Sequence, residues 1–240
     1  MEIKTNIQTK TYVDEGLRQY MLKVYNYMTG GLCLTALTAW LVAYTPALFR
    51  LFFSVSPEGA VGLSAFGWLC LFAPLIMVFA FGWVLNRGSL AQVQGLFWGF
   101  SAIMGLSLTP ILIAYTGTSV ARVFLITAAT FGGMSIYGYT TKKDLTGIGS
   151  FLIMGLWGLI IASIVNLFMR STGLSYAVSI ISVLIFTGLT AFDTQTIRQT
   201  YYMQDSADIA GRKAIRGALS LYLDFINIFI SLMNLMGERR

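Results

Sequence analysis

Residues 217–236 read GALSLYLDFINIFISLMNLM, an almost wholly apolar stretch that contains a carboxylate, Asp224. A helix that crosses a bilayer needs about 20 predominantly apolar residues, so this stretch is long enough to span. Its polar side chains recur every three or four positions, as Ser220, Asp224, Asn227, Ser231 and Asn234. That spacing places them on one stripe of a helix. We expect the stripe to face the interior of a helical bundle, since lipid would not solvate it.

Six further apolar runs precede this one along the chain. Mean hydropathy is +0.72 and only 11% of residues are charged, against about 25% in soluble domains. The sequence therefore predicts an all-α integral membrane protein, a bundle of seven transmembrane helices in one domain, 27–240, after a polar N-terminal tail, 1–26. The expected spans lie near residues 27–48, 62–85, 90–113, 120–139, 148–168, 174–193 and 217–236.

The basic residues indicate how these spans are oriented. With a cytoplasmic N-terminus, the inside receives Lys4, Lys10, Arg18, Lys23, Arg87, Lys142, Lys143, Arg198, Arg212, Lys213 and Arg216. The outside then receives Arg50, Arg122, Arg170, Arg239 and Arg240. Lys and Arg are enriched in cytoplasmic loops, which favours an inside N-terminus. A re-entrant last run would bring Arg239 and Arg240 inside, but its full length favours seven crossings.

Several classes of function are disfavoured by composition. The chain has no histidine, which removes Ser-His-Asp and Cys-His catalysis and HExxH zinc sites. Cys33 and Cys70 lie within apolar runs without metal-ligand spacing and are interpreted as packing residues. The net charge is +6, but the Lys and Arg residues lie almost entirely between apolar runs. They therefore indicate membrane orientation rather than nucleic-acid binding. We expect no tightly bound cofactor.

Two acidic residues stand out from the other eight. The eight lie in predicted loops or tails, as Glu2, Asp14, Glu15, Glu58, Asp144, Asp205, Asp208 and Glu238. Asp193 instead closes the sixth run, in TAFDTQ at 190–195, and Asp224 lies inside the seventh. A charge within a membrane span costs roughly 2.5–3.5 kcal/mol on insertion scales, so such residues are functional candidates. The structural alternative is that both aspartates hold helices together by hydrogen bonds.

The two aspartates lie at comparable predicted depth. Counted from Arg198 and Arg216 at 1.5 Å per residue, Asp193 and Asp224 are roughly 8 and 12 Å from the cytoplasmic surface. The carboxylates can therefore meet, and two carboxylates in a poorly solvated site tend to share a proton. This geometry predicts a pH switch that needs no histidine.

Three motifs give the chain a family resemblance. They are LYLDFIN at 221–227, FDTQ at 192–195 and TTKKD at 140–144. With these motifs the sequence resembles the Bax inhibitor-1 (transmembrane Bax inhibitor motif) family, and its bacterial branch in particular. The resemblance covers essentially the whole chain in the number and spacing of the spans. It implies six helices around a central last helix, and location in a bacterial inner membrane.

The resemblance also implies a function, a pH-sensitive calcium leak. In that picture Asp193 and Asp224 are the proton sensor of the gate, and an arginine near the end of the second span pairs with them. Arg87 is the nearest match, with Arg198 and Arg216 as rivals. Asn227, Ser231 and Asn234 either line the ion path or pack the helices together.

The leading hypothesis is thus a passive cation leak, for Ca²⁺, whose working partners are the lipid bilayer, Ca²⁺ and H⁺. Asp193 and Asp224, with Asn and Ser oxygens, would supply a weak and transient Ca²⁺ site, which suits conduction. The alternative is a regulator that binds another membrane protein, such as a quality-control protease, through residues 1–26. A transporter is not supported by any clear internal repeat.

An enzyme is not expected. Paired aspartates on two spans also describe intramembrane aspartyl proteases, whose second aspartate follows Gly-x-Gly and precedes a Pro-Ala-Leu motif. Here Asp224 follows Tyr222 and Leu223, and Pro-Ala-Leu occurs at 46–48, where the first run ends.

Overall fold

The computed structural model describes residues 2–55 and 61–240, with side chains described from residue 15 onward except at 55, 61 and 86. Met1 and Glu58 lie outside this description. Within it the helices are α1 (Glu2–Tyr44), α2 (Pro46–Phe52), α3 (Ala65–Arg87), α4 (Leu90–Ala114), α5 (Gly117–Thr140), α6 (Thr146–Met169), α7 (Thr172–Thr200) and α8 (Ala207–Met236). A short antiparallel hairpin, β1 (Phe53–Val55) and β2 (Val61–Leu63), pairs Phe53 with Leu63.

In the described ranges, seven helices are long and apolar enough to cross a membrane, namely all except α2. The predicted all-helical membrane bundle is therefore confirmed. Helix boundaries differ most at the start: residues 2–44 form one helix of 43 residues, where a tail and a span beginning at residue 27 were predicted. The helix ends at Tyr44 because Pro46 follows, and the residue before a proline disfavours helical geometry. Thr45 accordingly has an extended backbone.

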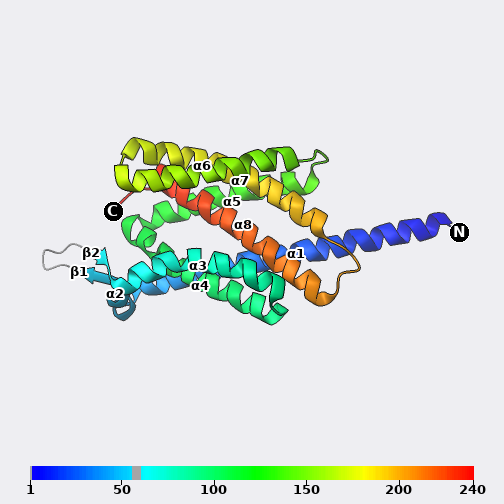
Figure 1. Ribbon diagram of the computed structural model, residues 1–240, viewed down its shortest axis with the longest axis horizontal. Coiled ribbons are helices and arrows are strands. Elements are labelled where there is room, and N and C mark those ends of the chain that lie inside the picture. Colours follow the sequence, from blue (N-terminus) through cyan, green and yellow to red (C-terminus); the bar gives the residue numbers. More distant parts are fainter. Residues whose placement is uncertain (1, 56–60) are drawn as a thin grey trace.

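Helix α8 lies at the centre of the bundle (Figure 1). Its main neighbours are α1, α4, α5 and α7, while α3 packs mainly on α4, and α6 mainly on α7. Of the seven spans, α8 is the most deeply buried. The expectation of a central last helix is confirmed, with α3 and α6 occupying outer positions.

Glycines allow two of the helix pairs to pack at backbone contact. A Cβ on Gly105 of α4 would come within 2.3 Å of the Thr35 carbonyl oxygen on α1. A Cβ on Gly138 of α5 would come within 2.2 Å of the Ala191 carbonyl oxygen on α7. Small residues at such crossings bring helices close enough for strong van der Waals packing. The second crossing fixes the part of α7 that carries Asp193.

Helix α8 runs the whole length of the bundle. Near its start, Asp208 accepts a hydrogen bond from the Leu90 backbone N–H at the α3–α4 connection, 3.3 Å away. Beyond its end, the Glu238 carbonyl accepts a bond from the Thr116 N–H at the α4–α5 connection, 3.0 Å away. These connections lie at the two ends of α4, so α8 extends from one end of the bundle to the other. Its 30 residues correspond to about 45 Å.

Candidate functional site

Asp193 on α7 is hydrogen-bonded to Ser220 on α8. The Ser220 hydroxyl donates to Asp193 Oδ2. Ser220 lies one helical turn before Asp224, so this bond places Asp193 within about a turn of Asp224 along α8. The two aspartates predicted from the sequence are thus brought together on facing helices.

Asp224 is buried and incompletely paired. Only 4% of its surface is exposed, and its Oδ2 atom has no hydrogen-bond partner among the residues that the structure describes. Asp193, a second carboxyl group, interacts electrostatically with Asp224, and their negative charges repel each other when both are ionised. An unpaired buried carboxyl oxygen is costly, and polar groups left in this state deserve a functional explanation.

The rest of the FDTQ motif fixes α7 to its neighbours. Thr194 shares a hydrogen bond of 3.1 Å with Ser135 on α5, and Ser135 shares one of 2.6 Å with the Tyr25 hydroxyl on α1. Gln195 accepts from the Leu145 N–H at 2.9 Å and donates to the Lys143 carbonyl at 2.8 Å. The two residues that follow Asp193, Thr194 and Gln195, are therefore hydrogen-bonded to α5 and to the α5–α6 connection.

A cavity of about 370 Å³ opens beside Asp193 at the α7–α8 end of the bundle. It is lined by Tyr20, Asp193, Thr196, Ile197, Thr200, Lys213, Arg216, Gly217 and Ser220. At its rim, Lys213 forms an ion pair of 2.6 Å with Asp205, which holds the α7–α8 connection. Asp193 lines this cavity, whereas the buried Asp224 does not.

The other predicted polar residues are used separately. The Asn227 side chain donates to the Leu223 carbonyl of its own helix at 2.8 Å. Ser231 is buried. Asn234 is exposed and accepts a long bond of 3.5 Å from the Tyr115 hydroxyl. They follow the predicted stripe along α8, from the buried centre to the far end.

The three candidate arginines have different surroundings. Arg87 ends α3 with an exposed side chain, and the structure does not bring it into the cavity with Asp193. Arg198 donates to the Tyr139 carbonyl and lies 5.9 Å from the centre of the Tyr139 ring. Arg216 lines the cavity with Asp193.

Some residues of the site were not singled out in the sequence. Ser220 was noted as part of the stripe but not as the partner of Asp193. The buried Tyr222 hydroxyl shares a hydrogen bond of 2.6 Å with Thr35 on α1, and Thr35 also donates to the Ser101 carbonyl on α4 at 2.8 Å. A tyrosine within a span, two residues from the aspartate, was the available signal.

The donor set matters for cations. Within the described residues, no group of three or more His, Cys, Asp or Glu side chains lies together as a metal site. Asp193 instead accepts a hydrogen bond from the Ser220 hydroxyl and shares its cavity with Lys213 and Arg216.

Comparison with known proteins identifies the family. Residues 17–240 match the family described as inhibitor of apoptosis-promoting Bax1. The chain belongs to the Bax inhibitor-1 family. An uncharacterized protein of Rickettsia prowazekii is 44% identical over 238 residues, 99% of this chain and 97% of that protein.

Other bacterial members of the Bax inhibitor-1 family are similarly related. An uncharacterized Caulobacter vibrioides protein is 43% identical over 230 residues, 95% of this chain and 92% of that protein. The Escherichia coli inner membrane protein YbhL is 42% identical over 227 residues, 94% of each chain. The recognition made from the LYLDFIN, FDTQ and TTKKD motifs is confirmed, and the chain is an integral membrane protein.

Proposed function

We propose that this protein is a passive cation leak, for Ca²⁺, gated by protonation of Asp193 and Asp224. The proposal rests chiefly on the buried Asp224 carboxyl, whose Oδ2 lacks a partner beside a second carboxyl group. A merely structural aspartate would be expected to have its oxygens hydrogen-bonded. An incompletely paired one changes its interactions when a proton or a cation arrives.

The gating argument follows from charge. Two neighbouring carboxylates repel when both are ionised, and one shared proton removes that repulsion. Asp193 lies on α7, whereas Ser220 and Asp224 lie on α8. A change in protonation therefore acts directly on the contact between α7 and α8. Movement between these helices would open or close the route from the cavity toward Asn227 and Ser231.

Calcium suits this site as a permeant ion rather than a bound cofactor. Ca²⁺ takes six to eight oxygen ligands, and a site with two carboxylates and a few neutral oxygens is weak. Weak binding allows an ion to leave as well as enter. We assign no catalytic role to either aspartate. We propose that the protein lies in the bacterial inner membrane, the location that the name of the relative YbhL gives. We also propose that its N-terminus is in the cytoplasm.

Calcium flux into proteoliposomes across a pH series tests the proposal. Replacing both aspartates by alanine is expected to abolish the pH dependence of flux. Arg122→Gln is the matched control, because Arg122 pairs with Glu238 at the opposite end of the bundle. Flux with unchanged pH dependence in the double alanine variant would refute the sensor.

A second candidate is regulation of another membrane protein, and the length of α1 favours it. At 1.5 Å per residue, its 43 residues span about 64 Å, twice the hydrocarbon thickness of a bilayer. The first part of α1 extends beyond the other helices (Figure 1). Deleting residues 2–14 separates the two candidates: a partner effect lost with this segment, and unaffected by the aspartate substitutions, favours regulation.

A further inference from the structure

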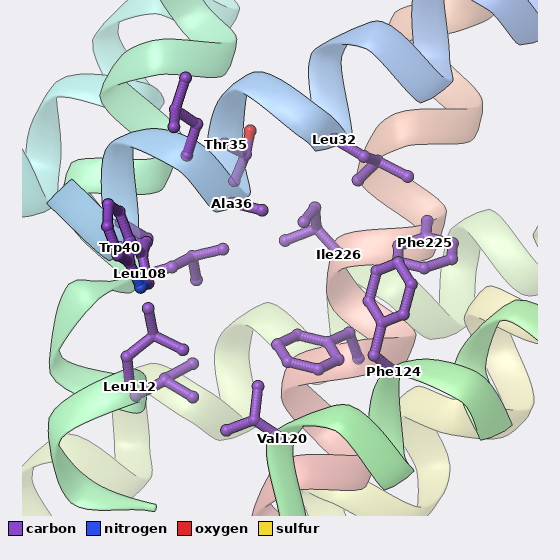
Figure 2. A pocket seen from close by; sticks show the side chains of 14 residues that line it. Leu32, Thr35, Ala36, Trp40, Leu108, Leu112, Val120, Phe124, Phe225 and Ile226 are labelled. Atoms are coloured by element: carbon purple, nitrogen blue, oxygen red, sulfur yellow. The ribbon is translucent and has the colours of Figure 1, made fainter. Parts of the chain in front are cut away.

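An apolar groove opens on the side of the bundle between the α1–α4 pair and α5 (Figure 2). Its volume is about 530 Å³, within the range of sites that hold small molecules. Leu32, Ala36 and Trp40 of α1 form one wall, Val120 and Phe124 of α5 the other. The floor is made by the central helix, with Phe225, Ile226 and Phe229.

The groove lies within the span, in the half of the bundle near the α4–α5 connection. Val120 is three residues from the start of α5, about 5 Å, and Phe225 is eleven residues from the end of α8, about 17 Å. This depth lies in the hydrocarbon of one leaflet. Its lining is almost entirely apolar, so its occupant is apolar too.

The length of the groove favours a lipid chain over a helix. From Leu32 to Trp40 it extends about 12 Å, within one leaflet, whereas a partner helix that crossed the bilayer would pass through about 30 Å of hydrocarbon. The exposed side chains of Trp40 and Phe124 lie on opposite sides of the groove (Figure 2). An extended acyl chain is the slender apolar occupant that a membrane supplies.

Charge at the mouth indicates which lipid. Ile111 and Val120 line the groove on either side of the α4–α5 connection. Across that connection lies the segment after α8: the Arg240 N–H donates to the Ala114 carbonyl at 3.0 Å, and Arg239 lies 5.9 Å from the Tyr115 ring centre. Arginines beside an interhelical groove complement an anionic headgroup, whereas a second copy of this chain would bring like charges together.

We propose that this groove binds one acyl chain of an anionic phospholipid, with its headgroup beside Arg239 and Arg240. The bound chain packs on Phe225, the neighbour of Asp224, and reaches Thr35, which is bonded to Tyr222. Lipid occupancy therefore supports α8 at the level of the aspartates. The proposal does not depend on ion conduction, and it can fail while the leak stands.

Fluorescence quenching tests it directly. Two single-tryptophan proteins retain Trp40, in the groove, or Trp68, outside it; the two residues are 54% and 50% exposed and lie near the same end of the bundle. In phosphatidylcholine nanodiscs containing a little phosphatidylglycerol with brominated chains, Trp40 is expected to be quenched at about a threefold lower mole fraction than Trp68, reflecting a site affinity above that of bulk lipid. Identical quenching curves would overturn the proposal.

Filling the groove provides the second arm. Ala36→Phe and, from the opposite wall, Val120→Phe should each abolish the excess quenching of Trp40, while Ala129→Phe, on the exposed face of α5 outside the groove, should leave it. Replacing Arg239 and Arg240 together by Gln should remove the preference for brominated phosphatidylglycerol over brominated phosphatidylcholine. Equal quenching by both lipids in the parent protein would overturn the anionic assignment. Shielding of Trp40 from both would assign the groove to a second copy of this chain instead.

Discussion

Ser220 donates its hydroxyl hydrogen to Asp193 across the α7–α8 contact, one turn below the buried Asp224. This bond joins Asp193, which lines the cavity, to α8, the helix that carries the buried Asp224. Protonation of Asp193, or cation binding to it, therefore changes a hydrogen bond to α8.

Ser220→Ala should shift the pH midpoint of calcium flux upward. A hydrogen bond donated to a carboxylate stabilises its charged form, so its loss favours protonation at higher pH. The measured quantity is the pH at half-maximal flux, compared between Ser220→Ala and the parent protein. Ser163→Ala is the control, because Ser163 donates within α6 to the Leu159 carbonyl. Equal midpoints for Ser220→Ala and the parent would argue against Ser220 as part of the sensor.

Asp224→Leu should stabilise the fold while removing the pH response. Replacing a buried polar group whose oxygen lacks a partner by an apolar side chain removes a penalty of about 1–3 kcal/mol. The measurement is the thermal midpoint of the detergent-solubilised protein, alongside flux. Asp193→Leu should give no comparable gain, since it leaves Ser220 without its acceptor. A lower midpoint for Asp224→Leu would show that Asp224 contributes to stability after all.

Gly138→Ala should destabilise the bundle, because its Cβ would meet the Ala191 backbone at 2.2 Å and force α5 away from α7. Overpacking of this kind costs about 1–3 kcal/mol. Gly133→Ala on the same helix has nothing within 4 Å of the added Cβ and should be neutral or stabilising. Comparison of the two thermal midpoints removes the effect of helix propensity. Similar midpoints would mean that the crossing adjusts without cost.

The loop between α5 and α6 provides a test outside the membrane. The Thr146 hydroxyl and then its backbone N–H donate to Asp144 at 2.6 and 2.9 Å, and these bonds lower the pKa of Asp144. Because the folded pKa is lowered, the stabilising effect is present at neutral pH and is lost as the pH falls through that pKa. Thr146→Val should raise the pKa of Asp144 part of the way to its ordinary value. Carbon NMR of the Asp144 carboxyl group measures this change. Thr140→Val should leave it unchanged.

The sequence predicted the bundle well because apolar run length is a nearly direct measure of span number. For residues 2–26 the polar composition indicated a tail, and the structure shows the backbone of this segment as a continuation of α1. Composition there describes solvent exposure and not backbone conformation. The short α2 and the β1–β2 hairpin were missed for a similar reason, since they lie in a connection whose local pattern is brief.

For the site, depth counting placed Asp193 and Asp224 about one helical turn apart, and the hydrogen bond from Ser220, one turn before Asp224, gives that proximity a cause. Helical periodicity identifies which residues share a face, as with Ser220 and Asp224. It does not identify the residue on another helix that meets them. The Tyr222–Thr35 bond joins residues 187 positions apart, and no local pattern could predict it.

The central position of α8 has a consequence for biogenesis. The helix that fills the middle of the bundle follows the six other spans along the chain, and a ribosome delivers it after them. The earlier spans must therefore enter the bilayer before the surface they pack against exists. Until α8 arrives, Thr35 and Asp193 lack the hydrogen bonds that Tyr222 and Ser220 supply and need substitute partners, from water, lipid or the insertion machinery. Assembly is then completed by the arrival of one helix with a polar stripe.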